Sequence, residues 1–146
     1  MKTVIFDLDG TLVKLDHRLD YILNEPKQWD KFYEEIENDE LLDDMYAIYE
    51  TFLYAPDVSI IIVTGRSDKY KQQTLDWLEK HGIMFDELYM RKEGDHRRDY
   101  EVKKDILDIL KQLKYDILCV FEDRDEVVQM YRENGVRCLQ VCNGNY

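Results

Sequence analysis

The sequence predicts a doubly wound α/β fold built on a mainly parallel five-stranded sheet. Apolar, β-branched runs alternate with segments of helical periodicity along the chain. The run at 58–63 is apolar almost throughout, which is typical of a parallel strand buried on both faces. A chain of 146 residues buries enough surface to fold without disulfides. We therefore expect one domain over residues 1–146.

Local signals place the elements in chain order. The first strand, at 2–8, runs into an Asp-x-Asp-Gly turn, and the second occupies 58–63. A helix over 68–81 begins at a Ser67/Asp68 cap and ends at Gly82. The remaining elements are a strand at 85–90, a helix at 99–113, a strand at 116–121, a helix at 124–134 and a strand at 136–141.

The segment between the first two strands, residues 15–57, predicts a helical insert that forms a minimal cap. Its apolar residues recur at three- and four-residue steps, which indicates two or three amphipathic helices. It carries three basic and thirteen acidic residues, so −10 of the total formal charge of −12 lies here. We expect the acidic residues to form a solvated outer face that discourages long polyanions from lying across it.

The sequence gives no sign of a membrane segment. No apolar run is long enough to span a bilayer, and the chain begins directly with a strand rather than a signal peptide. The three cysteines, Cys119, Cys138 and Cys142, are odd in number and lack C-x-x-C spacing. We expect reduced thiols and a cytoplasmic protein.

Polar residues cluster where three of the predicted strands end. The first strand ends in Asp7-Leu8-Asp9-Gly10-Thr11, the second in Thr64-Gly65-Arg66 and the fourth in Glu122-Asp123-Arg124. Ligand sites of open α/β sheets lie at the carboxyl ends of their strands. Four carboxylates in one crevice favour a divalent cation, and oxygen ligands favour Mg²⁺ over zinc.

A calcium-binding loop is an alternative explanation of Asp-x-Asp-Gly. Such a loop needs glycine at its sixth position and glutamate at its twelfth. Here the glycine is fourth and Arg18 is twelfth, so this alternative fails.

These motifs resemble those of the haloacid dehalogenase superfamily of phosphohydrolases, whose first motif is D-x-D-x-T. Within the superfamily the chain is most similar to the 3′-phosphatase domain of bacteriophage polynucleotide kinase. The likeness covers the whole chain and implies a Rossmann-like core. It rests on Asp7-Leu-Asp-Gly-Thr, Arg18, Thr64-Gly-Arg66, the run 94–99, Lys103, Asp123-Arg124 and Val127-Val128.

The resemblance implies a covalent mechanism assisted by Mg²⁺. Asp7 would be the nucleophile and form an aspartyl-phosphate. Asp9 would be the general acid and base, a role that a raised pKa would assist. By analogy, the Asp7 carboxylate, the Asp9 carbonyl and Asp123 would hold Mg²⁺. Glu122 stands where close relatives usually carry aspartate, so we expect it either near the metal or behind the residues that bind it.

Further roles follow from the same resemblance. Thr64 would bind a phosphoryl oxygen, and Thr11 would either do the same or serve as a turn residue. Lys103 would supply the countercharge, with Lys104 as the alternative. Asp99 would orient that lysine or nearby arginines.

Substrate contacts are assigned to Gly65 and three arginines, Arg18, Arg66 and Arg124. With the mixed-charge segment 91–104, the arginines predict a phosphate-binding rim. No continuous stretch interleaves aromatic and basic residues, as long single strands would require. We therefore expect a nucleic acid to contact the site only through its end.

Three functions remain open at this level. The first is a Mg²⁺-dependent phosphomonoesterase that removes 3′-phosphates from nucleic acid ends or 3′-nucleotides. The second is the same chemistry on free 5′-nucleotides or another small phosphate ester. The third is a non-catalytic binding module with the same fold. The chain has no kinase phosphate-binding loop, so a separate kinase or ligase partner is expected for the first. The oligomeric state is not predicted.

Overall fold

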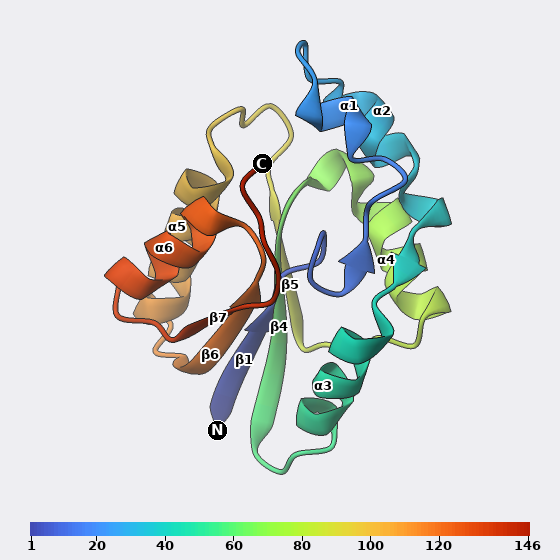
Figure 1. The fold of residues 1–146 in the computed structure, drawn as a ribbon. Helices are drawn as coiled ribbons and strands as arrows, with labels where there is room; N and C mark the ends of the chain where they lie inside the picture. Colours follow the sequence, from blue (N-terminus) through green and yellow to red (C-terminus); the bar gives the residue numbers. More distant parts are fainter.

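The computed structural model describes residues 1–146 as a parallel sheet between two layers of helices (Figure 1). Five strands lie in the order β5-β4-β1-β6-β7, and every adjacent pair is parallel. The predicted fold class is therefore confirmed. The strands of this sheet are β1 (Lys2–Phe6), β4 (Val58–Ser67), β5 (Glu87–Arg91), β6 (Asp116–Glu122) and β7 (Cys138–Gln140).

Helices cover both faces of the sheet. One layer contains α3 (Asp43–Leu53) and α4 (Lys71–Lys80), and the other contains α5 (Asp99–Gln112) and α6 (Asp125–Glu133). Val4 and Phe6 of β1 belong to the core on the α3–α4 side, whereas Ile5 belongs to the core on the α5–α6 side. All three side chains are fully buried, which explains the unbroken apolar run that predicted a central strand.

Several bounds differ from the sequence prediction. Strand β4 continues to Ser67, so residues 64–67 lie within the strand rather than after it. The helix expected at 68–81 begins with a short 3₁₀ turn, η2 (Asp68–Tyr70). The Ser67 hydroxyl accepts a hydrogen bond from the Lys69 N–H and caps this turn. Strand β7 is shorter than predicted, and β5 begins two residues later.

The segment between β1 and β4 is mostly helical but contains an unpredicted antiparallel ribbon. Its helical elements are α1 (Asp20–Leu23), α2 (Trp29–Glu34), η1 (Ile36–Asn38) and α3. The ribbon pairs β2 (Val13–Lys14) with β3 (Glu40–Leu41). Strands of two residues carry no detectable periodicity, so the sequence pattern could not reveal them.

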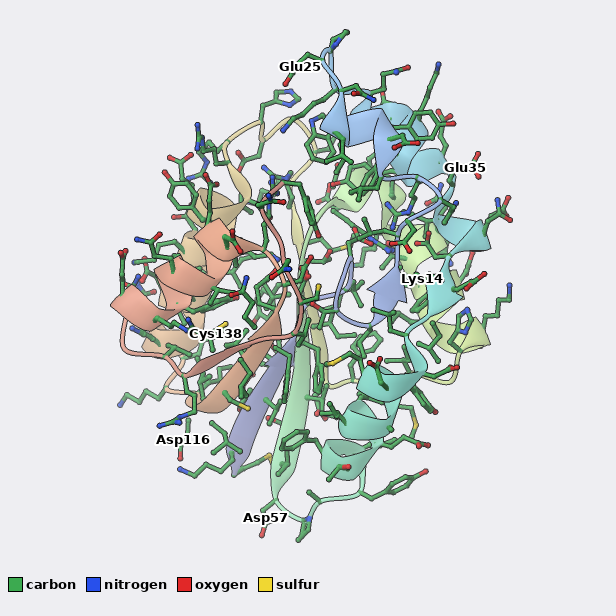
Figure 2. The ribbon with its side chains drawn as sticks, viewed as in Figure 1. Lys14, Glu25, Glu35, Asp57, Asp116 and Cys138 are labelled. Carbon is green, nitrogen blue, oxygen red and sulfur yellow. The ribbon has the colours of Figure 1, made fainter.

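This segment stands over the carboxyl ends of the strands through α1 and α2 (Figure 1). Figure 2 shows Glu25 at its tip, with Asp57 and Asp116 at the opposite end of the molecule. No helix is both long and apolar enough to cross a bilayer. All three cysteines are free, with Cys119 and Cys138 buried and Cys142 exposed.

Candidate active site

The end of β1 places the carboxylates of Asp7 and Asp9 in one crevice. Asp7 continues the strand, since its N–H donates to the Phe121 carbonyl at 3.0 Å. The chain then turns through Gly10, whose φ is +83°. A Cβ atom at Gly10 would also collide with the Asp123 carboxylate. Glycine is thus required here for both backbone conformation and space.

Asp7 meets two carboxylates from the end of β6. Asp7, Glu122 and Asp123 are all buried, and one oxygen from each lies within 4.8 Å of the others. Such a set of hard oxygen donors fits a small divalent cation. The three residues therefore form a candidate metal site.

The ionisation of these carboxylates supports the same conclusion. Burial, reinforced by repulsion from Glu122, raises the pKa of Asp7 to about 8. Burial and then the charge of Asp7 raise the pKa of Asp123 to about 7. Burial also raises the pKa of Glu122 to about 7, against the effect of Lys103. The cluster carries more negative charge than its surroundings balance, and a cation would stabilise its ionised form.

Lys103 on α5 is the lysine that reaches this cluster. Its Nζ donates to Asp7 Oδ1 at 2.9 Å and to Glu122 Oε2 at 2.7 Å. Lys104 instead pairs with Asp108 on the outer face of the same helix, at 2.6 Å. Burial opposes the charge on Lys103, yet the neighbouring carboxylates raise its pKa well above the usual value. Of the two candidates, only Lys103 lies at the site.

Glu122 holds both the lysine and the turn that follows β6. One carboxylate oxygen accepts from Lys103, and the other accepts from the backbone N–H groups of Asp123 at 3.1 Å and Arg124 at 3.2 Å. The longer glutamate side chain allows both contacts. These contacts position Asp123 as well as Lys103.

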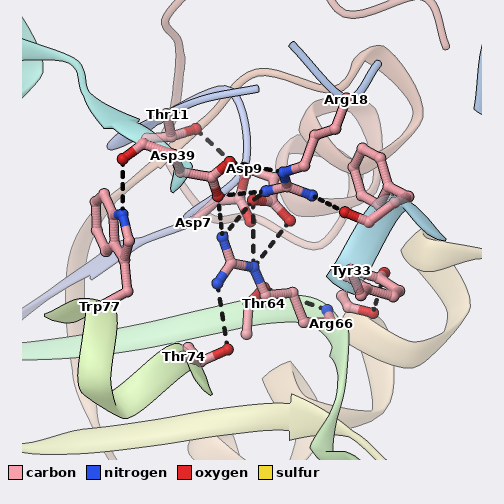
Figure 3. Close-up of polar contacts among 12 residues, drawn as sticks. Asp7, Asp9, Thr11, Arg18, Tyr33, Asp39, Thr64, Arg66, Thr74 and Trp77 are labelled. Carbon is pink, nitrogen blue, oxygen red and sulfur yellow. Dashed lines mark hydrogen bonds and ion pairs between the residues drawn. The ribbon is translucent and has the colours of Figure 1, made fainter. Parts of the chain in front are cut away.

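Asp9 lies in a different electrostatic environment, between two buried arginines (Figure 3). Arg18 Nη2 and Arg66 Nη2 each lie 2.6 Å from Asp9 Oδ1. Neither arginine side chain is exposed to solvent. Arg66 also donates to the Thr74 hydroxyl at 3.2 Å, which fixes its far side.

This environment gives Asp9 the opposite of the raised pKa that would assist a general acid. Burial disfavours the charged carboxylate, but the guanidinium groups of Arg18 and Arg66 outweigh burial. They hold the pKa of Asp9 well below its usual range. Asp9 is thus ionised in this structure.

Asp39 completes the arginine network and was not predicted. Its carboxylate accepts from Arg18 Nε at 2.8 Å and lies 3.4 Å from Arg66 Nη2, while His17 Nε2 lies 2.6 Å away. Trp77 Nε1 donates to its backbone carbonyl at 3.0 Å. In the sequence, Asp39 is one of thirteen acids in 15–57, and no local signal separates it from the exposed ones.

Two threonines from different strand ends line this region. The Thr11 hydroxyl donates to Asp7 Oδ2 at 3.3 Å, so Thr11 contacts the carboxylate that the sequence suggested as nucleophile. Thr64 is buried, lines the cavity beside Asp7, and accepts from the Arg66 N–H at 3.2 Å. The structure therefore brings both threonines to the site.

Gly65 and Asp99 fit together at the edge of the crevice. A Cβ atom at Gly65 would collide with the Asp99 carboxylate, so only glycine allows this close approach. Asp99 lies 3.4 Å from Lys103, 3.6 Å from Arg91 and 3.8 Å from Arg124. It connects the buried lysine with arginines nearer the surface.

The site opens from a small cavity into a wide groove. The cavity, about 50 Å³, is lined by Asp7, Thr64 and Asp123 among others. The adjoining groove has a volume of about 1170 Å³. Tyr146, another residue not predicted, lines both and donates its hydroxyl hydrogen to Asp123 Oδ2.

Comparison with known proteins gives a match over the full chain. The family model of the polynucleotide kinase PNKP phosphatase domain matches residues 1–146. A protein of Autographa californica nuclear polyhedrosis virus, assigned as a bifunctional polynucleotide kinase/RNA ligase, is 29% identical over 133 residues. That alignment covers 90% of this chain and 18% of the viral protein.

Solved structures are similar as well. A chain in the structure of the Pnkp1/Rnl/Hen1 RNA repair complex is 31% identical, with a TM-score of 0.83. The match covers 99% of this chain but 43% of that chain. A haloacid dehalogenase-like hydrolase from Streptococcus pneumoniae, 17% identical with a TM-score of 0.66, shares the fold. The chain thus spans less than half the length of the first two relatives.

We predict that Asp39→Ala destabilises the protein by about 3–5 kcal/mol, because it leaves two buried arginines with one carboxylate. Urea unfolding measures the change. Asp108→Ala, which removes a surface pair with Lys104, is the control and should change stability by less than about 1 kcal/mol. Equal effects of the two substitutions would contradict the buried network.

We also predict that stabilisation by Mg²⁺ increases with pH. Because the pKa of Asp7 rises from 3.8 to about 8 in the fold, the metal-free folded state retains a proton that the unfolded chain releases. Metal-free stability should therefore fall as pH rises through this interval. A cation displaces the proton, so the Mg²⁺-induced rise in Tm should be larger at about pH 8.5 than at about pH 6.

Thermal unfolding in EDTA and in MgCl₂ at both pH values checks this prediction. Asp123→Asn should abolish most of the Mg²⁺-induced rise. An equal Mg²⁺-induced rise in Tm at the two pH values would argue against metal binding at this cluster. So would an equal rise in Asp123→Asn and in the wild-type protein.

Proposed function

The chain belongs to the family of PNKP phosphatase domains within the haloacid dehalogenase superfamily and is a phosphatase, and we propose that it is a Mg²⁺-dependent polynucleotide 3′-phosphatase. The observation that carries this proposal is the family match over residues 1–146 together with the buried Asp7–Lys103 contact of 2.9 Å. We further propose that residues 1–146 act as one domain, with 15–57 as its minimal cap.

In the proposed reaction Asp7 attacks the phosphorus atom. The new P–O bond gives an aspartyl-phosphate as the bond to the 3′-oxygen breaks, and Asp9 donates a proton to that oxygen. Asp9 then takes a proton from water, which attacks phosphorus, releases phosphate and regenerates Asp7. Lys103 keeps the attacking carboxylate oriented and offsets negative charge.

The environment of Asp9 sets a condition on this reaction. While Arg18 and Arg66 both contact it, Asp9 stays ionised and can only accept a proton. For it to donate, these contacts must loosen. A phosphate dianion entering the crevice would compete for the guanidinium groups, since arginine binds phosphate well, and so would let the pKa of Asp9 rise.

As the family resemblance implies, the carboxylates of Asp7 and Asp123 would hold Mg²⁺ together with the backbone carbonyl of Asp9. When bound, the metal would neutralise charge on the transferring phosphoryl group. Glu122 supports this set by holding Lys103 and the Asp123 backbone. Its role in the proposal is to position these groups rather than to react.

Phosphoryl oxygens would be bound by groups that line the small cavity. The Thr64 hydroxyl and the Gly65 backbone lie at the end of β4 within this lining. Arg124 lines both cavity and groove, so it would contact the phosphate next to the reacting one. Thr11 would orient Asp7 through their hydrogen bond.

The polynucleotide substrate and its role in repair are inferred from the relatives. One relative is assigned as a polynucleotide kinase/RNA ligase and another belongs to an RNA repair complex. A kinase or ligase acting with this chain, on the same or another polypeptide, would suit both. The alternative substrate class is free 5′-nucleotides or small phosphate esters, which the open groove also admits.

We predict that Asp7→Asn lowers kcat on a 3′-phosphorylated oligonucleotide by about 10³-fold or more, because the amide is not a nucleophile. Phosphate release measures the loss. When the 3′-phosphate is labelled, an acid quench should trap the labelled aspartyl-phosphate on the wild-type protein but not on the variant. Asp116→Asn, at the far end of the sheet, is the control and should keep wild-type activity. Unchanged turnover in Asp7→Asn would refute the mechanism.

We predict at least about 10-fold higher kcat/KM for 3′-phosphorylated oligonucleotides than for other phosphate esters, which corresponds to about 1.4 kcal/mol of differential transition-state binding. The panel contains 3′-phosphorylated DNA and RNA, a 5′-phosphorylated oligonucleotide, 3′- and 5′-mononucleotides and a sugar phosphate. Preference for 5′-mononucleotides would establish the alternative. Preference for the sugar phosphate would contradict any nucleic acid substrate.

A further inference from the structure

A wide groove leads from the catalytic cavity across the end of the molecule. Its walls come from α2, the loop from β5 to α5, the start of α6 and residues 144–146. Figure 1 shows these segments gathered over the carboxyl ends of the strands. The groove and the cavity share six lining residues, so they are continuous: Trp29, Tyr33, Arg91, Asp99, Arg124 and Tyr146.

The charge of this groove is opposite to that of the segment above it. Eight lysines and arginines line the groove against six acids. Of the thirteen acids in 15–57, only Asp30 is among the lining residues. Figure 2 shows Glu25 and Glu35 at the outer edge of that segment. The acidic face is thus turned outward, as the sequence predicted, while its lysines line the groove.

Three of the lining lysines are available for a ligand. Lys27, Lys31 and Lys92 line the groove, and none lies within 4.0 Å of a carboxylate oxygen. By contrast, Arg97 and Arg98 pair with acids at 2.8–2.9 Å. The unpaired ammonium groups make the groove a surface for a polyanion.

An aromatic platform of Trp29 and Tyr33 lines both the groove and the catalytic cavity. Trp29 is 38% exposed and lies nearly parallel to Tyr33, with ring centroids 6.0 Å apart and planes 22° apart. The Tyr33 hydroxyl donates to the Gly65 carbonyl at 3.4 Å, which ties the platform to the end of β4. Lys27 Nζ lies 5.7 Å from the centroid of the Trp29 ring.

We propose that this groove binds the last few nucleotides of a single strand. The base next to the reacting phosphate stacks on Trp29, and upstream phosphates contact Lys27, Lys31 and Lys92. Stacking on an exposed ring flanked by unpaired cations is how proteins hold single strands without reading sequence. Lys27, Trp29, Lys31 and Tyr33 lie within seven residues of the chain, a short interleaved stretch that the sequence prediction missed, and Lys92 joins them from the loop after β5. This inference rests on the proposed function and identifies where the polynucleotide substrate would lie.

The test measures kcat/KM on 3′-phosphorylated substrates of one to four nucleotides. For wild-type protein, kcat/KM should increase about 10-fold or more from the shortest substrate to the longest. Trp29→Ala should lose most of that increase. Trp29→Tyr should retain it. The ratio is taken within each variant, so damage to folding or chemistry cancels. Tyr54→Ala, which removes an exposed ring outside the groove, is the matched control and should keep the wild-type ratio.

A second measurement tests the lysines. The double variant Lys27→Glu/Lys31→Glu should reduce the slope of log affinity against log salt by about 1.4 for a tetranucleotide. Lys80→Glu, an exposed charge outside the groove, should leave the slope unchanged. An unchanged slope in the double variant would overturn the proposed phosphate contacts.

Binding of a labelled tetranucleotide with a 3′-hydroxyl end separates the two proposals. Binding that depends on Trp29, without turnover of any 3′-phosphate, would refute the proposed function but support single-strand binding in the groove. Turnover of a 3′-mononucleotide with no gain from length, or with the same gain in Trp29→Ala, would refute the groove and keep the function.

Discussion

The site depends on an unbalanced set of buried charges. The carboxylates of Asp7, Glu122 and Asp123 lie together, and the Lys103 ammonium group pairs with two of them, Asp7 and Glu122. These four groups carry a net charge of −2 when all are ionised. Burial raises the pKa values of all three carboxylates, and repulsion between them raises these values further. Either protons or a divalent cation can remove this imbalance. A cation does so without protonating Asp7, the carboxylate that we propose as the nucleophile.

The neighbouring half of the crevice is balanced instead. Asp9 and Asp39 face Arg18 and Arg66, two negative charges against two positive ones, all buried or nearly so. Balance is why the pKa of Asp9 is held low although Asp7, two residues earlier, has a raised one. Two aspartates of one motif therefore differ in ionisation because their partners differ. This order is the reverse of the one that the proposed roles need, since a nucleophile must be ionised and an acid must hold a proton. A cation at Asp7 and looser arginine contacts at Asp9 would exchange the two states.

The sheet and most of the candidate site could be predicted because both follow from local pattern plus parallel topology. Once strands are parallel, their carboxyl ends must meet, so Asp7, Thr64 and Asp123 could be grouped from sequence alone. The ionisation of Asp9 could not, since it depends on which arginine side chains fold inward. No local signal separates Asp39 from the other acids of 15–57. The strands of the β2–β3 ribbon are too short to show a periodicity in the sequence. Tertiary packing, not local preference, decides these features.

The small cavity and the wide groove would contribute differently to substrate recognition. A cavity of about 50 Å³ is far smaller than ordinary small-molecule sites, which are about 300–1000 Å³, so it has room for the reacting group and little more. Discrimination between esters must then arise in the groove of about 1170 Å³. The groove holds eight lysines and arginines against six acids although the protein carries a charge of −12, because twelve of the thirteen acids of 15–57 lie outside its lining. Net charge would therefore repel the proposed nucleic acid substrate from most of the surface and leave the groove as the path by which its end enters.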